Sequence, residues 1–281
     1  MQTSNSKDQR ARWQAQLKLD YSRKGDKTCL VKKSQKGPLT VQRPFYPEGD
    51  ICHSYILHPP GGVVGGDILD IDVNATTGAH CLITTPGATK FYRSKSDVES
   101  NQTLRINVKK DAIVEWLPQQ NIFFSGACSQ LHTEINIQPG GKFIGWEIHC
   151  FGRPANNEGF DQGTIKSCTQ ININGELKLV EQLNTHGNSL AQSSCGLRNK
   201  AMQASLIAAP FSEDQKQKLE QLLLDYPYKD LIGMTLVDEV LVIRLLGDRI
   251  EPILENFISL WSQLRTEWLQ RPACAPRIWD T

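Results

Sequence analysis

Residues 171–179, ININGELKL, carry the clearest local structural signal in the chain. Isoleucine and leucine alternate with polar residues on both sides of Asn174 and Gly175. A two-residue type I′ turn requires positive φ at both central positions, and asparagine followed by glycine adopts it readily. The segment therefore predicts a β-hairpin.

The same alternation recurs at residues 13–21, 69–73, 104–108 and 131–137. A period of two puts one set of side chains on each face of a strand, so each run predicts a half-buried strand. Several such runs separated by turns read as stacked antiparallel strands. We therefore expect a mainly β fold, a single β-rich body of many antiparallel strands with about two α-helices in the C-terminal third.

The domain boundaries follow from where these patterns begin and end. Residues 1–12 are polar and charged, and we expect them to be disordered. The β-rich domain should span residues 13–270, because a chain of this length can form one all-β domain. Residues 271–281 are expected to form a C-terminal tail.

The first helix is predicted over residues 213–226. Ser212 and Gln215 have the spacing of a capping box, and leucines at helical spacing follow them. Pro227 should end the helix.

The second helix is predicted to start at Asp248, with Glu251 as its reciprocal cap, and to cover residues 249–269. Its broad apolar stripe fits either the core or a docking face, and the core is favoured because amphipathic helices usually pack on their own domain. Residues 231–246, between the two helices, read as a pair of strands.

Charge and cysteine usage narrow the class of protein. The chain has 31 basic and 30 acidic residues, so no overall field favours nucleic acid or anionic lipid. No apolar run is long enough to span a membrane. The eight cysteines lack paired Cys-x-x-Cys spacing, which favours reduced thiols in the cytoplasm.

The glycine-rich run at residues 61–67, GGVVGGD, does not predict a nucleotide site. It lacks the lysine and hydroxyl residue of a phosphate loop, and an alternating strand pattern follows it instead of a helix. The six histidines form no preformed chelating motif, because neighbours such as Cys52 and His53 point to opposite faces of a strand. We expect no tightly bound cofactor or metal.

Two other classes of function remain as alternatives. A small metal-dependent hydrolase on a β scaffold would need His53, His58, Asp67 and His80 to converge around an activated water. A carbohydrate-binding module would need exposed aromatic residues, whereas Trp116, Trp146, Trp261 and Trp268 lie in apolar runs that indicate burial.

A series of unusual strings runs along the first 165 residues. They are GPL at 37–39, VQRPFYPEG at 41–49, HPPGG at 58–62, GD at 66–67, TTPGA at 84–88, YRS at 92–94, EWLPQ at 115–119 and GR at 152–153. In order and spacing they resemble the UreD (UreH) family of urease accessory proteins.

The resemblance implies a non-catalytic protein that assists nickel insertion into urease. A family member would bind the accessory protein UreF, recruit the GTPase UreG through it, and engage apo-urease in a hetero-oligomer. It would handle Ni²⁺ only transiently. It also implies a β-rich body with two helices, in agreement with the periodicity.

A protein that passes nickel onward needs few, exchangeable ligands. We expect Asp67, Glu115 and Glu158, with His58 as a softer donor, to line a polar nickel path, since acidic side chains lower the cost of moving a cation through protein. The alternative is that each carboxylate caps a turn or pairs with a nearby cation such as Lys90, Arg93 or Arg153.

Two segments have the aromatic and arginine side chains that dominate binding energies at interfaces. We expect them to help bind UreF or urease, although Phe45 and Tyr92 could equally be core residues. The candidate partner-binding residues are Gln42, Arg43, Phe45, Tyr46, Tyr92 and Arg93.

Overall fold

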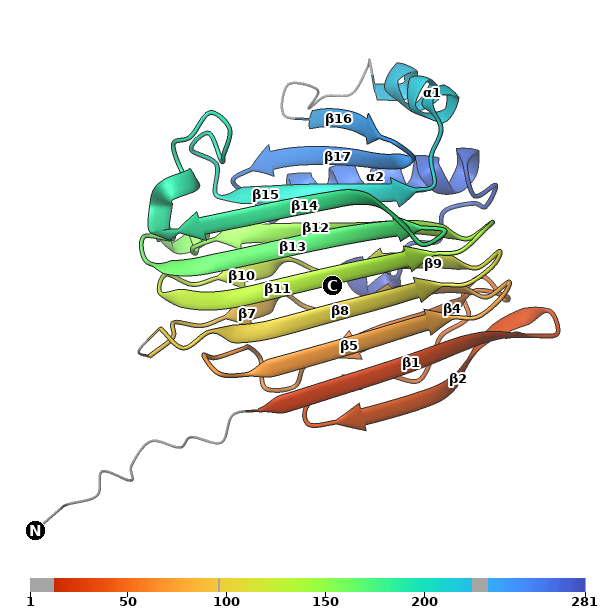
Figure 1. Ribbon diagram of the computed structural model, residues 1–281, viewed down its shortest axis with the longest axis horizontal. Helices are drawn as coiled ribbons and strands as arrows, with labels where there is room; N and C mark the ends of the chain where they lie inside the picture. Colours follow the sequence, from red (N-terminus) through yellow and green to blue (C-terminus); the bar gives the residue numbers. More distant parts are fainter. Residues whose placement is uncertain (1–12, 96, 224–231, 281) are drawn as a thin grey trace, which may run out of the picture.

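The computed structural model describes residues 13–95, 97–223 and 232–280, which form two large sheets packed face to face (Figure 1). The expected disorder of residues 1–12 lies outside the described residues. In the described residues the first sheet has seven strands, in the order β14 (Glu176–His186), β13 (Gly163–Ile173), β11 (Ala127–Ile137), β8 (Ser100–Val108), β5 (Ile68–Ala75), β1 (Gln14–Lys24) and β2 (Lys27–Lys36).

The second sheet has ten strands in the described residues. Its main order is β16 (Ile232–Val237), β17 (Val240–Gly247), β15 (Met202–Ala209), β12 (Lys142–Phe151), β9 (Ile113–Leu117), β6 (His80–Thr84), β4 (Cys52–Leu57) and β3 (Thr40–Val41). The short strands β10 (Asn121–Phe123) and β7 (Thr89–Phe91) branch from β12. The mainly β prediction is confirmed.

The expected antiparallel stacking is wrong for the centre of both sheets. Strands β5, β8, β11 and β13 are parallel neighbours, as are β4, β6, β9 and β12. The chain alternates between the sheets and winds as a solenoid, so each coil returns in the direction of the previous one. Period-two alternation reports a buried face but not strand direction, which is why the sequence pattern missed this.

Short connections at one end keep the coils in register. The links from β5 to β6, β8 to β9 and β11 to β12 each contain a residue with positive φ, namely Gly78, Asp111 and Gly140. A Cβ on Gly140 would lie 1.9 Å from Asp111 Oδ1, so a larger residue would force the Asp111 side chain to move and would also have to adopt the positive φ of 73°. Long loops connect the strands at the opposite end.

The predicted hairpin is confirmed as β13 and β14, with Asn174 and Gly175 at φ of 54° and 84°. The strand pair β16 and β17 is also confirmed. Antiparallel ladders in the described residues include these hairpins and the pairing of β12 with β15.

A row of amide side chains crosses the outer face of the seven-stranded sheet. Asn74, Asn107, Asn136 and Asn172 each donate to the residue one strand back, beginning at Asp20, over 2.9, 2.9, 3.3 and 2.9 Å. The row exists because parallel strands in register place equivalent residues side by side.

Two hydrophobic cores result from this architecture. One lies between the sheets and includes Leu19, Val73 and Phe123. The other lies between the ten-stranded sheet and helix α2 (Ile250–Glu267), where Trp146 and Trp261 are buried. Figure 1 shows α2 behind that sheet.

Helix α1 (Glu213–Leu223) begins with the predicted capping box. Ser212 N donates to Gln215 Oε1 over 2.8 Å, and Gln215 N donates to Ser212 Oγ over 3.3 Å. The expected continuation to residue 226 and the stop at Pro227 lie outside the described residues.

The predicted start of α2 is wrong. Its N-cap is Arg249, with no side-chain cap hydrogen bond. The Asp248 carboxylate instead accepts hydrogen bonds from Lys200 Nζ and Ala201 N, and Glu251 pairs with Arg249. The Asp248 carboxylate, which the local spacing predicted as the helix cap, therefore binds residues far away in the sequence instead.

The segment after α2 packs back onto the body. Trp279, in the short helix η4 (Arg277–Asp280), packs against Trp146 and edge to face against Trp261, with ring centroids 5.5 and 5.4 Å away. Two other short helices are η1 (Pro154–Asn156) and η2 (Gly187–Leu190). No helix in the described residues is long and apolar enough to cross a membrane.

The substitution Asn107→Ala removes the middle of the amide row. Asn74 then loses a donor and Asn136 an acceptor, so we expect the free energy of unfolding to fall by about 1–2 kcal/mol. Asn101→Ala, on the same face of β8 but without a side-chain hydrogen bond among the described residues, should change it by less than about 0.5 kcal/mol. Urea denaturation measures both, and equal losses would contradict a role for the row.

Candidate functional site

Glu115, a candidate for the nickel path, lies in a buried charge cluster under α2. Its Oε1 accepts from His80 Nε2 over 2.6 Å and from Arg265 over 3.2 Å, and its Oε2 accepts from Trp261 Nε1 over 2.5 Å. Strands β6 and β9 present His80 and Glu115 on the same face because they run parallel in register. Glu115 and Arg265 are both inaccessible to solvent.

Arg265 connects this cluster to the segment before β4. Its two terminal nitrogens bind the two Glu48 oxygens over 2.9 and 3.0 Å, and Glu48 also contacts His53 Nε2 at 2.7 Å. One of these nitrogens also donates to the Pro272 carbonyl. A single guanidinium thus joins the helix, strand β9, the segment before β4 and the C-terminal segment. We call Glu48, His53, His80, Glu115 and Arg265 the Arg265 cluster.

The cluster holds its carboxylates in the charged form. Burial acts to raise the pKa of Glu115, but the hydrogen bond and charge of His80 and the charge of Arg265 outweigh it, so the pKa falls below its usual value. Burial likewise acts to raise the pKa of Glu48, and His53 and Arg265 reverse it. Glu115 is therefore fully engaged in ion pairs within the fold.

Asp67 has a different environment, at the end of the glycine-rich loop. Its side chain is buried and accepts from the backbone N–H of Trp13 over 3.2 Å and of Val64 over 2.9 Å. These bonds fasten the loop to the start of the first sheet, as in the turn-capping alternative. The charge of Asp67 also acts on the nearby His58 imidazole.

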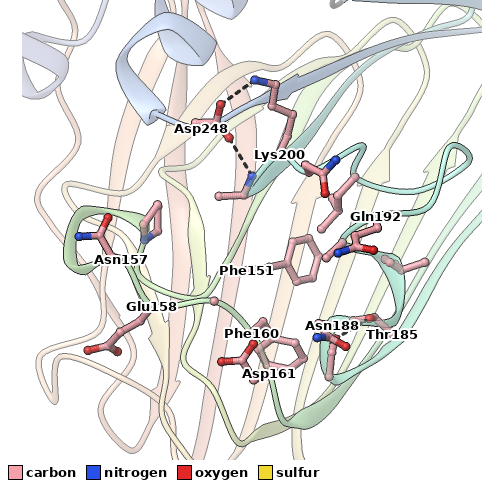
Figure 2. Close-up of a pocket in the computed structure, with 18 residues that line it drawn as sticks. Phe151, Asn157, Glu158, Phe160, Asp161, Thr185, Asn188, Gln192, Lys200 and Asp248 are labelled. Carbon is pink, nitrogen blue, oxygen red and sulfur yellow. Dashed lines mark hydrogen bonds and ion pairs between the residues drawn. The ribbon is translucent and has the colours of Figure 1, made fainter.

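Glu158 is exposed and forms an ion pair with Arg153. It lines a surface cavity of about 490 Å³ between the β12–β13 connection and the loop after β14. Figure 2 shows Lys200 and Asp248 paired at one end of this cavity and Asp161 at the other. The four path candidates therefore do not share one site.

The ligand set of the alternative hydrolase is also separated. His53 and His80 bind different carboxylates, while His58 and Asp67 lie at the two ends of the loop at residues 58–67. Within residues 13–95, 97–223 and 232–280, no three His, Cys, Asp or Glu side chains are placed to hold a metal ion.

A second set of polar side chains lies between the two sheets, where the sequence had not placed any. Glu147, on β12, accepts from Thr133 Oγ1 over 2.7 Å and from Thr169 Oγ1 over 3.2 Å, both on the opposite sheet. His149 follows on the same face, with Nε2 3.9 Å from Glu147. Burial lowers the pKa of His149 despite the opposing charges of Glu147 and Glu181, which favours neutral imidazole.

Glu147 lines an inter-sheet cavity of about 320 Å³ that includes His58, Gln119 and Asn121. Burial also lowers the pKa of His58, against the charge of Asp67. Residues from the strings HPPGG, TTPGA and EWLPQ line this cavity. They come together because parallel strands β4, β6 and β9 end at the same edge of the sheet.

A smaller cavity of about 20 Å³ lies beyond Glu147 and is shared with His149 and Glu181. Glu181, on β14, also lines an open cavity of about 800 Å³ at the edge of the two sheets. Glu147 and Glu181 thus each belong to two neighbouring cavities. We call Glu147, His149 and Glu181 the inter-sheet row.

One signal for this row was present in the sequence. Strand β12 reads KFIGWEIHCF, and Glu147 and His149 are polar residues two apart in an apolar run, hence on one face. Glu181 had no such signal, because polar residues occur throughout β14.

The first segment proposed to bind partners is largely accessible. Gln42 and Arg43 are exposed, and Phe45 is 44% exposed and stacks on Tyr55 with ring centroids 4.9 Å apart. Tyr46 is partly buried under Lys27, and its hydroxyl accepts from Cys52.

The second segment lies at the end with long loops. Tyr92 is half-buried and meets Phe124 edge to face, with ring centroids 4.9 Å apart. Arg93 is exposed and donates to Gln162 Oε1 over 3.2 Å.

Comparison with known proteins gives consistent relatives over the whole chain. The sequence profile of the UreD urease accessory protein family matches residues 14–280. A urease accessory protein UreD of Aliivibrio fischeri strain MJ11 is 42% identical over 278 residues, covering 96% of each chain. Those of Alcanivorax borkumensis and Escherichia coli are 43% and 44% identical, covering 100% and 96% of this chain and 96% and 97% of theirs.

The substitution Arg265→Met tests the charge cluster under α2. It leaves Glu48 and Glu115 buried without their shared cation, so we expect the free energy of unfolding at about pH 7 to fall by about 3–5 kcal/mol. Arg271→Met removes a partly exposed pair with Asp50 and should cost less than about 1 kcal/mol. Chemical denaturation measures both.

The pH dependence of the stability lost in Arg265→Met shows whether the broken ion pairs are its cause. The folded-state pKa values of Glu48 and Glu115 lie below 4.5, so their stabilisation is present above that pH and is lost as the pH falls through them. The gap between wild type and Arg265→Met should therefore narrow below pH 4.5. A gap that stays constant down to acid unfolding would mean that lost packing is responsible.

Proposed function

This chain belongs to the UreD urease accessory protein family, and we propose that it binds a UreF-type protein, and through it a UreG-type GTPase, on apo-urease while nickel passes between its sheets. It is a non-catalytic accessory protein of urease maturation. The observation that carries the proposal is the match of family profile and relatives over nearly the whole chain. The proposal places it in the cytoplasm, where its eight free thiols would stay reduced.

The nickel path is assigned to the inter-sheet row, reached through the cavity that contains His58. Three features support this assignment. The small cavity shares Glu147 with the inter-sheet cavity and Glu181 with the open cavity. The carboxylates are not neutralised by a buried arginine as Glu115 is, and the strings HPPGG, TTPGA and EWLPQ line one mouth.

The chemistry of the row suits a cation in transit. Neutral imidazole and carboxylate oxygen are ligands that Ni²⁺ accepts, and the lowered pKa values of His58 and His149 keep both rings neutral at cytoplasmic pH. The described residues hold no preformed three-ligand group, so an ion would bind weakly and could leave.

Asp67, Glu115 and Glu158 lie outside this row in the proposal. Asp67 fastens a loop beside the mouth, Glu115 belongs to the Arg265 cluster, and Glu158 pairs with Arg153 at the surface. Their assignment to the nickel path stays a prediction, which the experiment below tests for Glu158.

The path is tested by nickel-dependent activation of urease in cells that co-express the UreF-type and UreG-type proteins. Glu147→Gln and Glu181→Gln remove charge and keep shape, so we expect each to lower activation at limiting nickel by about tenfold or more, since each removes a ligand for the ion. Glu158→Gln should activate normally. Co-purification of the UreF-type partner should be unchanged in all three.

Two results would contradict this assignment. Normal activation by both row variants would exclude the inter-sheet path. Loss of activation in Glu158→Gln alone would favour the surface cavity in Figure 2 instead.

The partner surface is assigned to Gln42, Arg43, Phe45 and Tyr46, with Tyr92 and Arg93 as a second contact. Phe45→Ala should weaken capture of the UreF-type protein or apo-urease by about 2 kcal/mol, the typical loss for an interface aromatic. Arg93→Ala tests the second contact in the same pull-down. Val31→Ala, at a residue exposed to a similar extent on β2, is the control. Undiminished capture by both Phe45→Ala and Arg93→Ala would remove these segments from the interface.

A further inference from the structure

Glu181 lies at the boundary between the interior of the sandwich and the open cavity at its edge. Its Oε1 accepts from Ser205 Oγ over 3.1 Å and from Arg244 Nε over 3.0 Å. Its Oε2 is buried and has no hydrogen-bond partner among the described residues. One oxygen is therefore neutralised from the solvent side, while the other is free to bind.

Arg244 reaches Glu181 from the other sheet. It lies on β17, whereas Glu181 lies on β14, the edge strand of the seven-stranded sheet. The Arg244 side chain is 48% exposed and lines the open cavity. Two other cations on that cavity have different partners, since Arg198 donates to the Ser194 carbonyl and Lys200 pairs with Asp248.

A guanidinium on a carboxylate competes with a metal cation for the same negative charge. Binding of Ni²⁺ at Glu181 would place it beside a positive group already on Oε1, so the ion must either displace Arg244 or bear the repulsion. A partly exposed arginine can swing into solvent at small cost, because exposed ion pairs are weak.

We propose that Arg244 is a displaceable competitor for nickel at Glu181, which keeps this carboxylate from trapping the ion at the edge of the two sheets. The inference rests on the proposed inter-sheet path and adds a positioning residue to it. Arg244 does not bind nickel. It sets how long Glu181 can hold the ion.

This role differs from that of the guanidinium in the Arg265 cluster. Arg265 is inaccessible and has two carboxylate partners, so it stays in place, whereas Arg244 has one carboxylate partner among the described residues and an open cavity beside it. Arg265 therefore forms permanent ion pairs, whereas Arg244 forms an exchangeable one.

The test is nickel affinity and release in the full chain, purified with its UreF-type partner. Arg244→Met keeps most of the apolar stem and removes the charge, so we expect a Kd for Ni²⁺ about tenfold lower by calorimetry and a proportionally slower release to a chelator. Arg244→Lys keeps a cation beside Glu181 and should behave within about twofold of wild type. Arg198→Met, on the same cavity without contact to Glu181, is the matched control.

The double variant Arg244→Met/Glu181→Gln shows whether the effect passes through Glu181. If it does, the gain in affinity is lost in the double variant. Thermal unfolding of each variant checks that the fold is unchanged.

The outcomes separate this inference from the path itself. If Arg244→Met leaves affinity and release unchanged while Glu147→Gln weakens binding, the competitor role is wrong and the path stands. If neither Glu147→Gln, Glu181→Gln nor Arg244→Met alters nickel binding, the path is wrong as well. An equal gain in Arg198→Met would show a general charge effect and would also overturn the role of Arg244.

Discussion

Parallel stacking of successive coils in register is the constraint on which the rest of the structure depends. Because each coil places its residues beside those of the coil before, side chains of one kind form rows across strands. On the outer face the rows are amides from Asn74 to Asn172. Between the sheets, Phe91, Phe123 and Phe151 from successive coils pack in a row with ring centroids 4.9 and 5.7 Å apart. The long loops lie at one end, where the strings HPPGG, TTPGA and EWLPQ line one cavity.

The same stacking creates two polar regions. In one the carboxylates are fully paired with buried cations, and in the other they are not. On the helix side, Glu48 and Glu115 share Arg265 and two histidines, so their charges are satisfied and the region fastens α2 to the sheet. Between the sheets, Glu147 and Glu181 are held by hydroxyls and by one partly exposed arginine. A partly buried carboxylate whose partner can leave is suited to a passing cation, whereas a fully paired carboxylate is suited to stability.

Local sequence patterns predicted what depends on neighbouring residues. The turn at Asn174 and Gly175, the cap at Ser212 and the existence of the strands all follow from spacings of a few residues. Strand direction could not be predicted in this way, because side chains alternate between the two faces in parallel and antiparallel sheets alike. Glu115 and Asp67 were predicted as nickel-path residues, but their partners Arg265 and Trp13 lie 150 and 54 positions away, so only the fold reveals them. Glu147 and His149 were detectable from β12 alone.

The central claim is that the space between the sheets, and not the helix side or the surface, offers Ni²⁺ its ligands. Crystals of the full chain with its UreF-type partner, soaked in Ni²⁺ and measured at the nickel absorption edge, test it most directly. The account predicts an anomalous peak between Glu147, His149 and Glu181, at partial occupancy because the ligands are few. Peaks confined to the surface beside Glu158, or at Asp67, with none between the sheets, would contradict it.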